Sequence, residues 1–189
     1  MFYILINEPQ RTLHSAKEEL EMLKIILADM EEDIDDIREL FYGNLCEVKP
    51  IFERELNVSF DVDKFLGNDI AKLSQFAAPS CGLFLAKVNG QNAGCAGFRR
   101  NNQSTAEVKR MYVKPEYRKQ GIGRALLEAV ISEATKLGYI KIRLDTVFFA
   151  KEAQNLYRSF GFQEIAPYPE SDIPSNLHSK WIFMELGNT

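Results

Sequence analysis

Residues that build metal centres and disulfide frameworks are scarce in this sequence. Its 189 residues include three cysteines and two histidines. An odd number of widely spaced cysteines argues against a disulfide framework, and the spacing is unlike that of a metal site. We therefore expect reduced, buried thiols at Cys46, Cys81 and Cys95, and no metal. His14 and His178 are too isolated to support a Ser-His-Asp or Cys-His catalytic set.

Long apolar segments are also missing. The run from Met1 to Ile6 is short, lacks a basic flank and precedes Asn-Glu-Pro, so we expect neither a signal peptide nor a membrane span. With 46% hydrophobic and 26% charged residues the composition is that of an ordinary globular protein. We predict a cytoplasmic protein with an N-terminal extension over residues 1–21 and one domain over residues 22–187.

The extension carries one local signal. Ser15 and Glu18 have the spacing of a capping box, which predicts a short helix from Ala16. No catalytic constellation occurs there. We expect the extension to serve in packing or in a contact between subunits, and a homodimer is one option.

The stretch from Glu107 to Leu137 has the most readable pattern. It predicts a strand to Val113, a turn at Pro115, a loop containing Gly-x-Gly, and a helix that ends at Gly138. The helix follows from apolar residues that recur every three or four positions. These positions are Ile122, Ala125, Leu126, Ala129, Val130, Ala134 and Leu137.

Positive charge is concentrated around this loop. Residues 109–124 contain six basic side chains and one acid, a net charge of +5 in a chain whose formal charge is −4. A helix N-terminus presents unpaired N–H donors and a partial positive charge, and glycines let the backbone approach a ligand closely. The pattern therefore predicts a site for a phosphate or another polyanion.

Arg118-x-x-Gly121-x-Gly123, between a strand and a helix, resembles the acetyl-CoA loop of the GNAT superfamily of N-acyltransferases. A later segment, Ala153-Gln-Asn-Leu-Tyr-Arg-Ser-Phe-Gly-Phe162, resembles that superfamily's helix carrying a tyrosine and ending at Gly-Phe. A dinucleotide-binding loop is the competing interpretation. It would require glycine at position 126, which is Leu126.

The resemblance covers residues 22–187 and implies an α+β fold, a mixed, mostly antiparallel sheet with helices on both faces. The sequence agrees with the expected order of elements, β, α, α, three β, α, β, α, β, β. Its clearest local signal is a hairpin in which Asn89–Asn92 joins strands over residues 82–88 and 93–98. The resemblance also decides an ambiguous region between Leu13 and Tyr42, which contains neither glycine nor proline.

In that region we predict a strand over residues 23–27 and then a helix. Asp29 would cap the helix with Glu32 reaching back, and Gly43 would end it. One or two short helices are expected between residues 46 and 78.

The resemblance also implies site residues. Glu107 lies 11 positions before Arg118, the offset of the general base in members that use one. The alternatives are an acid paired with Lys109, and water as the base. Strand alternation would place Glu107, Lys109, Met111 and Val113 on one face. Tyr157 would stabilise the departing thiolate. The alternative is an amphipathic tyrosine on the inner side of its helix that serves only in packing.

Acetyl-CoA is the implied co-substrate. Many members carry asparagine where this chain has Ala150, so the hydrogen bond of that asparagine must be absent here or supplied by Asn155 or Gln154. The expected cofactor-binding residues are Met111, Tyr112, Val113, Arg118, Lys119, Gln120, Gly121, Ile122, Gly123, Arg124 and Asn155.

The resulting expectation is an enzyme that transfers acetyl from acetyl-CoA directly to the primary amine of a small molecule. A non-catalytic acyl-CoA sensor and a protein lysine or N-terminal acetyltransferase are the alternatives. Nucleic acid is not an expected partner, because the net charge is negative and the basic loop already has a ligand. Neither is a membrane.

Overall fold

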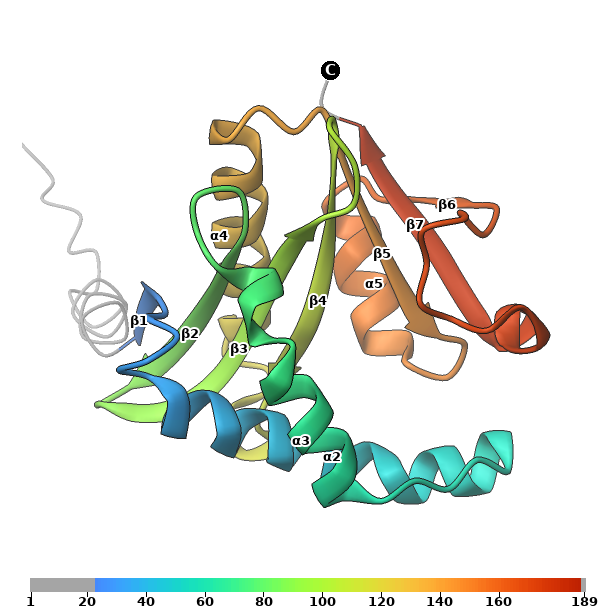
Figure 1. Ribbon diagram of the computed structural model, residues 1–189, viewed down its shortest axis with the longest axis horizontal. Helices are drawn as coiled ribbons and strands as arrows, with labels where there is room; N and C mark the ends of the chain where they lie inside the picture. Colours follow the sequence, from blue (N-terminus) through green and yellow to red (C-terminus); the bar gives the residue numbers. More distant parts are fainter. Residues whose placement is uncertain (1–22, 188–189) are drawn as a thin grey trace, which may run out of the picture.

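The computed structural model describes residues 23–187, so the predicted N-terminal helix lies outside the described residues. Seven strands form one sheet in the order β1-β2-β3-β4-β5-β7-β6 (Figure 1). All neighbouring strands are antiparallel except β4 and β5, which are parallel. The strands are β1 (Leu23–Leu27), β2 (Gly82–Val88), β3 (Gln91–Arg100), β4 (Thr105–Val113), β5 (Lys141–Val147), β6 (Gln163–Ile165) and β7 (Trp181–Gly187).

Helices cover both faces of this sheet. One face carries α4 (Ile122–Lys136) and α5 (Lys151–Ser159), and the other carries α2 (Ile34–Leu56) and α3 (Val62–Ala71). Short 3-10 turns, η1 (Leu73–Phe76), η2 (Pro115–Tyr117) and η3 (Ser175–Lys180), complete the fold. Two apolar cores result, one under α4 and α5 and one under α2 and α3. The predicted element order and the mixed sheet are confirmed.

Local sequence signals account for the hairpin and for α4. The β2–β3 turn places Asn89 at φ 51° and Gly90 at φ 79°, the left-handed conformations that this residue pair tolerates. Four of the seven predicted apolar positions of α4 are buried, whereas Ala125 and Ala129 are half-buried and Leu137 is 41% exposed; Gly138 follows the helix at φ 86°. The buried residues of α4 are Ile122, Leu126, Leu127, Val130 and Ala134.

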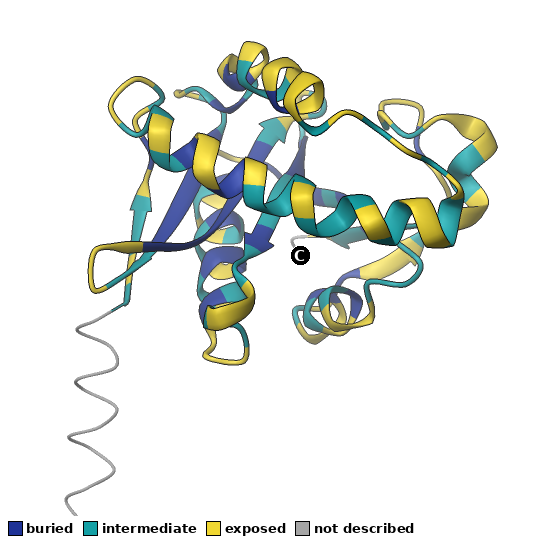
Figure 2. Cartoon of the chain, turned by 90° about the horizontal axis from the view of Figure 1, so that it is seen from below, coloured by how far each residue is buried: buried dark blue, intermediate teal, exposed yellow. Residues whose placement is uncertain are grey.

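The predicted bounds of α2 were wrong. The Asp29 carboxylate accepts hydrogen bonds from the N–H groups of Glu31 and Glu32 in a turn, and the helix begins only at Ile34. It then continues past Gly43 and Pro50 to Leu56. Gly43 serves packing, because a Cβ there would lie 3.3 Å from the Tyr112 hydroxyl. Seen from below, this single long helix crosses the sheet (Figure 2).

A bulge in β4 changes which residues face the site. Arg110 has φ 55°, and the register with β3 shifts between Cys95 and Gly97. As a result Met111 packs with Val108 in the core under α4, so strict alternation fails between them. The prediction that Met111 and Val113 share a face with Glu107 is therefore wrong.

The cysteines only partly match expectation. All three are free, but Cys46 is exposed and Cys81 is half-buried, while Cys95 is buried. Within residues 23–187, no helix has the length and apolar character to cross a bilayer. The same residues contain no group of three or more His, Cys, Asp and Glu side chains placed to hold a metal ion.

Candidate functional site

The parallel strands β4 and β5 separate after a short paired stretch. They pair only where Thr105–Glu107 meets Lys141–Arg143, yet β4 continues to Val113 and β5 to Val147. Figure 1 shows the two strands diverging, with α5 behind the gap. The remaining edge of β4 thus has backbone groups without a neighbouring strand, which an extended ligand could pair.

A donor-rich loop borders this opening. Gly121 is the N-cap of α4 at φ 82°, and no side chain caps the helix. A Cβ added to Gly121 would meet no heavy atom within 4 Å. The N–H groups of residues 119–124 donate to no acceptor in the described part of the chain. Consecutive unsatisfied donors at a helix start suit a phosphate, so these residues fit the diphosphate of coenzyme A.

Much of the local positive charge is already neutralised. Arg118 donates to the Val113 carbonyl over 2.9 Å and to the Glu47 carboxylate over 2.7 Å. Lys109, Arg110 and Lys114 also form ion pairs, with Asp145, Asp69 and Glu39 respectively. The net charge counted from the sequence therefore overstates the pull on an anion, and the backbone N–H groups supply much of the site.

Two cations remain close to the loop. Lys119 has no ion pair within residues 23–187 and adopts φ 62°. The Arg124 guanidinium lies 4.7 Å from the centroid of the Phe160 ring, donates to the Ser159 hydroxyl over 2.9 Å and forms only a long, exposed ion pair of 3.9 Å with Glu128. Gln120 donates to the Glu116 carbonyl over 3.1 Å and is exposed.

Glu107 is fully buried and saturated with donors. Oε1 accepts from the Tyr168 hydroxyl at 2.7 Å and lies 2.9 Å from Lys109 Nζ. Oε2 accepts from Arg99 Nε at 2.8 Å and lies 2.7 Å from a second Arg99 nitrogen. This arrangement leaves little room for an incoming proton. The alternative that Glu107 pairs with Lys109 is what the structure shows.

The network extends to β5 and to the loop between β6 and β7. Lys109 Nζ lies 2.7 Å from Asp145 Oδ2, and Asp145 has a side chain that is 11% exposed. Arg99 also pairs with Asp172 at 2.6 Å. Arg99, Asp145, Tyr168 and Asp172 were not singled out from the sequence. Only Asp145 had a usable signal, because it follows the buried part of β5 at the opening.

Tyr157 is buried among apolar residues on the α4 side of the sheet. Its ring lies 6.0 Å from Phe162, centroid to centroid. Burial, aided by the nearby charge of Asp145, raises the pKa of the Tyr157 hydroxyl above its usual value. The hydroxyl therefore stays protonated at neutral pH and can donate a hydrogen bond.

The other predicted cofactor residues differ in what they present. Tyr112 faces α2, and burial together with Glu47 raises its pKa to about 12. Asn155 is exposed on α5. Gln154 is buried and donates to the carbonyls of Val147 and Phe148, so this side-chain nitrogen holds the β5–α5 turn. Gln154 therefore does not offer that nitrogen to a ligand.

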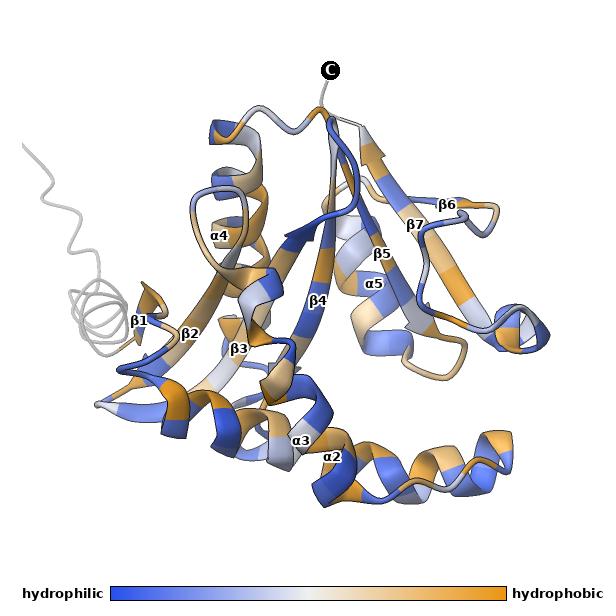
Figure 3. Cartoon of the chain, in the orientation of Figure 1, coloured by the Kyte–Doolittle hydropathy of each residue, from blue (hydrophilic) through white to orange (hydrophobic). Residues whose placement is uncertain are grey.

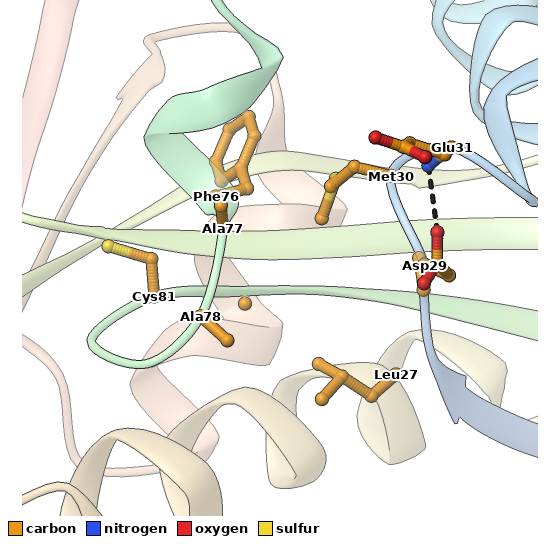
Figure 4. A pocket seen from close by; sticks show the side chains of 10 residues that line it. Leu27, Asp29, Met30, Glu31, Phe76, Ala77, Ala78 and Cys81 are labelled. Atoms are coloured by element: carbon orange, nitrogen blue, oxygen red, sulfur yellow. Dashed lines mark hydrogen bonds between the residues drawn. The ribbon is translucent and has the colours of Figure 1, made fainter.

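A separate cavity of about 310 Å³ lies near the β1 edge (Figure 4). It is four strands away from β5 in the sheet order. Leu27, Met30 and Phe76 line it together with the acids Asp29 and Glu31. The Asp29 carboxylate at its rim is committed to the neighbouring N–H groups. This cavity contributes nothing to the site at the opening.

Known proteins share this fold. The chain superposes on an acetyltransferase of the GNAT family from Staphylococcus aureus with a TM-score of 0.68 and 24% sequence identity, over 88% of this chain and 99% of the other. An acetyltransferase from Salmonella typhimurium, solved with its cofactor acetyl-CoA, superposes with a TM-score of 0.62 and 22% sequence identity, over 89% of this chain and 95% of the other. At these identities the likeness shows the fold.

Sequence comparison gives the family. Residues 47–162 match the model of the acetyltransferase (GNAT) family. An uncharacterised N-acetyltransferase of Schizosaccharomyces pombe is 30% identical over 84% of this chain and 93% of its own length. An IAA acetyltransferase of Azospirillum brasilense is 29% identical over 66% of this chain and 86% of its own length. The chain therefore belongs to the GNAT family and is an acetyl-CoA-dependent acyltransferase.

Proposed function

We propose that this protein transfers the acetyl group of acetyl-CoA directly to the primary amine of a small molecule. The observation that carries the proposal is the opening between β4 and β5, bordered by a loop whose N–H groups at residues 119–124 have no acceptor among residues 23–187. That opening has the shape for an extended carrier arm, and the loop has the chemistry for the diphosphate at one end of it.

The carrier would be held mainly by backbone. The diphosphate would accept hydrogen bonds from residues 119–124, with Lys119 and Arg124 as the side-chain cations. The arm would pair with the free edge of β4 at residues 111–113. A backbone N–H in that segment would also stabilise the oxyanion when the thioester carbonyl becomes tetrahedral.

The acceptor must first lose a proton, because an ammonium group has no lone pair. At a pKa near 10.4, about one alkylamine in a thousand is free at pH 7.4. We assign the proton acceptor to Asp145, acting directly or through water, because only its Oδ2 is engaged by Lys109. Glu107 then becomes a positioning residue that orders Arg99, Lys109 and Tyr168.

The transfer balances without another reactant. The amine lone pair forms the C–N bond with the thioester carbon, and collapse of the tetrahedral intermediate breaks the C–S bond. The sulfur leaves as a thiolate and takes up a proton, while the amine proton passes to Asp145 or water. Tyr157 would donate a hydrogen bond to the departing sulfur. A thiol pKa near 8.5, below that of tyrosine, makes full proton transfer from Tyr157 unfavourable.

Small amines are favoured over protein acceptors for one reason. The ring of Phe52, in the second half of α2, lies 6.0 Å from the ring of Phe149, just after β5, and 6.0 Å from that of Trp181 at the start of β7, and these contacts narrow the approach to the opening. A cytoplasmic location and a homodimer remain predictions.

The test is thiol release from acetyl-CoA in the presence of an amine panel, with a lysine peptide and an N-terminal peptide alongside. Release that depends on a small amine supports the proposal. Release only with peptides would favour a protein acetyltransferase. Tight binding of acetyl-CoA without release for any acceptor would favour a sensor.

A further inference from the structure

Five aromatic side chains gather beside the proposed transfer site without joining either core. We call them the aromatic cluster: Phe52, Phe60, Phe65, Phe149 and Trp181. Phe52 is at the centre, with ring centroids 6.1 Å from Phe60, 6.0 Å from Phe149 and 6.0 Å from Trp181. Phe60 and Phe65 follow at 4.8 Å. None of the five belongs to the buried clusters, and Phe65 is 47% exposed.

The cluster comes from segments that are distant in sequence. Phe52 lies in the second half of α2, Phe60 between α2 and α3, Phe149 after β5, and Trp181 at the start of β7. Figure 3 shows that this half of α2 alternates hydrophobic and hydrophilic residues and extends past β4. An edge-to-face arrangement with half-exposed rings leaves apolar and aromatic surface for a further ring.

The register places the cluster next to Asp145. Val147 pairs with Trp181, and Asp145 lies two residues earlier on β5, pointing to the same face. Two residues of strand span about 7 Å. An ammonium held at Asp145 and a ring placed against Trp181 would thus be joined by about two or three carbon atoms.

Charge around Asp145 also suits a cationic acceptor. Three carboxylates face this region, on Glu107, Asp145 and Asp172, against the two cations Arg99 and Lys109. Nearby Arg143 is paired with Glu185 at 2.8 Å. The excess negative charge would attract an ammonium, while the aromatic cluster would receive an uncharged ring.

From this juxtaposition we propose that the acceptor is a primary amine joined to an aromatic ring by a short alkyl linker. The inference rests on the proposed acetyl transfer and adds the substrate class. The ammonium end meets Asp145, and the ring packs against the aromatic cluster. Phe149 and Trp181 then act as specificity residues.

The test compares kcat/KM for 2-phenylethylamine, 2-cyclohexylethylamine and propylamine by thiol release. We expect kcat/KM for 2-phenylethylamine to be at least tenfold higher than for propylamine. It should also be at least twofold higher than for 2-cyclohexylethylamine. Phe149→Leu should lower the ratio of 2-phenylethylamine to propylamine at least fivefold. Tyr42→Leu is the matched control, because Tyr42 is an aromatic residue of α2 that is 46% exposed and outside the cluster.

Binding supplies a second readout, since Trp181 is the single tryptophan of the chain. Adding 2-phenylethylamine to the complex with coenzyme A should change Trp181 fluorescence, whereas propylamine should not. Equal kcat/KM for the three amines, or a ratio unmoved by Phe149→Leu while the melting temperature falls, would show that the cluster only packs α2 and would overturn the inference. In that case propylamine still releases thiol, so the proposed function survives. Failure of every amine to release thiol would remove both.

Discussion

The hydroxyl of Tyr168 donates a hydrogen bond of 2.7 Å to Oε1 of Glu107, a carboxylate with no solvent exposure. This bond ties the loop between β6 and β7 to the strand that borders the opening. Asp172 on the same loop pairs with Arg99, which also holds Glu107. The loop position and the charge network are therefore coupled.

Tyr168→Phe should lower the free energy of unfolding by about 1.5–3 kcal/mol, because a buried bond to a charged acceptor is lost. Tyr139→Phe is the matched control, since the Tyr139 hydroxyl donates over 2.8 Å to the neutral carbonyl of Ser80. In that control the free energy of unfolding should fall by about 1 kcal/mol. Urea denaturation measures both. Equal losses in the two variants would contradict the importance given to the Glu107 contact.

Glu107→Gln should destabilise the protein by about 1.5–3 kcal/mol, because Arg99 and Lys109 lose hydrogen bonds to a charged acceptor, although each keeps a second carboxylate, Asp172 and Asp145 respectively. Turnover should fall, but the pH profile of kcat/KM in the folded fraction should keep its shape. Steady-state assays between pH 6 and 9, with unfolding followed in parallel, test this. A loss at neutral pH that becomes smaller at pH 9 would return Glu107 to the role of general base.

Asp145→Asn should instead lower kcat/KM by about two to four decades at neutral pH, with a smaller loss at pH 9, where more of the amine is already free. The physical reason is that an amide cannot accept the ammonium proton. The same pH series on the wild type is the reference. An unaltered profile for this variant would leave water as the base.

Tyr157→Phe should reduce kcat by about one to three decades through loss of a donor at the sulfur. Its KM for acetyl-CoA should change little, because the diphosphate contacts remain. The raised pKa of Tyr157 adds a further expectation: wild-type activity should show no loss from Tyr157 ionisation up to about pH 10. Full activity in the variant would reduce Tyr157 to a packing residue.

Stability at low pH tests a second cluster, at the start of α2. Hydrogen bonds from Lys87 and Asn92 lower the pKa of Asp36 below its usual value of 3.8. A lowered pKa adds stability above pH 3.8 that is lost as pH falls through the folded-state pKa. Asp36→Asn should therefore cost about 1 kcal/mol at pH 7 and progressively less below pH 4. A cost independent of pH, measured by urea denaturation, would contradict this assignment.

Local signals explain which parts of the fold were predictable. The turn at Asn89–Gly90 and the helix after Gly121 depend on neighbouring residues, so the sequence alone predicts them. The length of α2 cannot be predicted from neighbouring residues, because Gly43 and Pro50 end a helix in most contexts. Here Gly43 fits against Tyr112, and packing prevails over local preference.

In the site, too, features set by neighbouring residues were predictable, and features set by distant contacts were not. Gly121 and Tyr157 were predictable through motifs carried by contiguous residues. The bulge at Arg110 has no local signal, and it reverses the facing of Met111 and Val113. Pairing of Glu107 with Tyr168 joins residues 61 positions apart, so no spacing rule could reveal that the carboxylate is saturated.

Calorimetric titration of coenzyme A into the wild type and two variants tests the central claim most directly. Gly121→Trp and Gly90→Trp are matched, since both glycines have positive φ and no atom within 4 Å of an added Cβ, so both carry similar backbone strain. Binding should weaken at least a hundredfold in Gly121→Trp and stay within threefold of wild type in Gly90→Trp. Unchanged affinity in Gly121→Trp would contradict binding of the diphosphate at this loop.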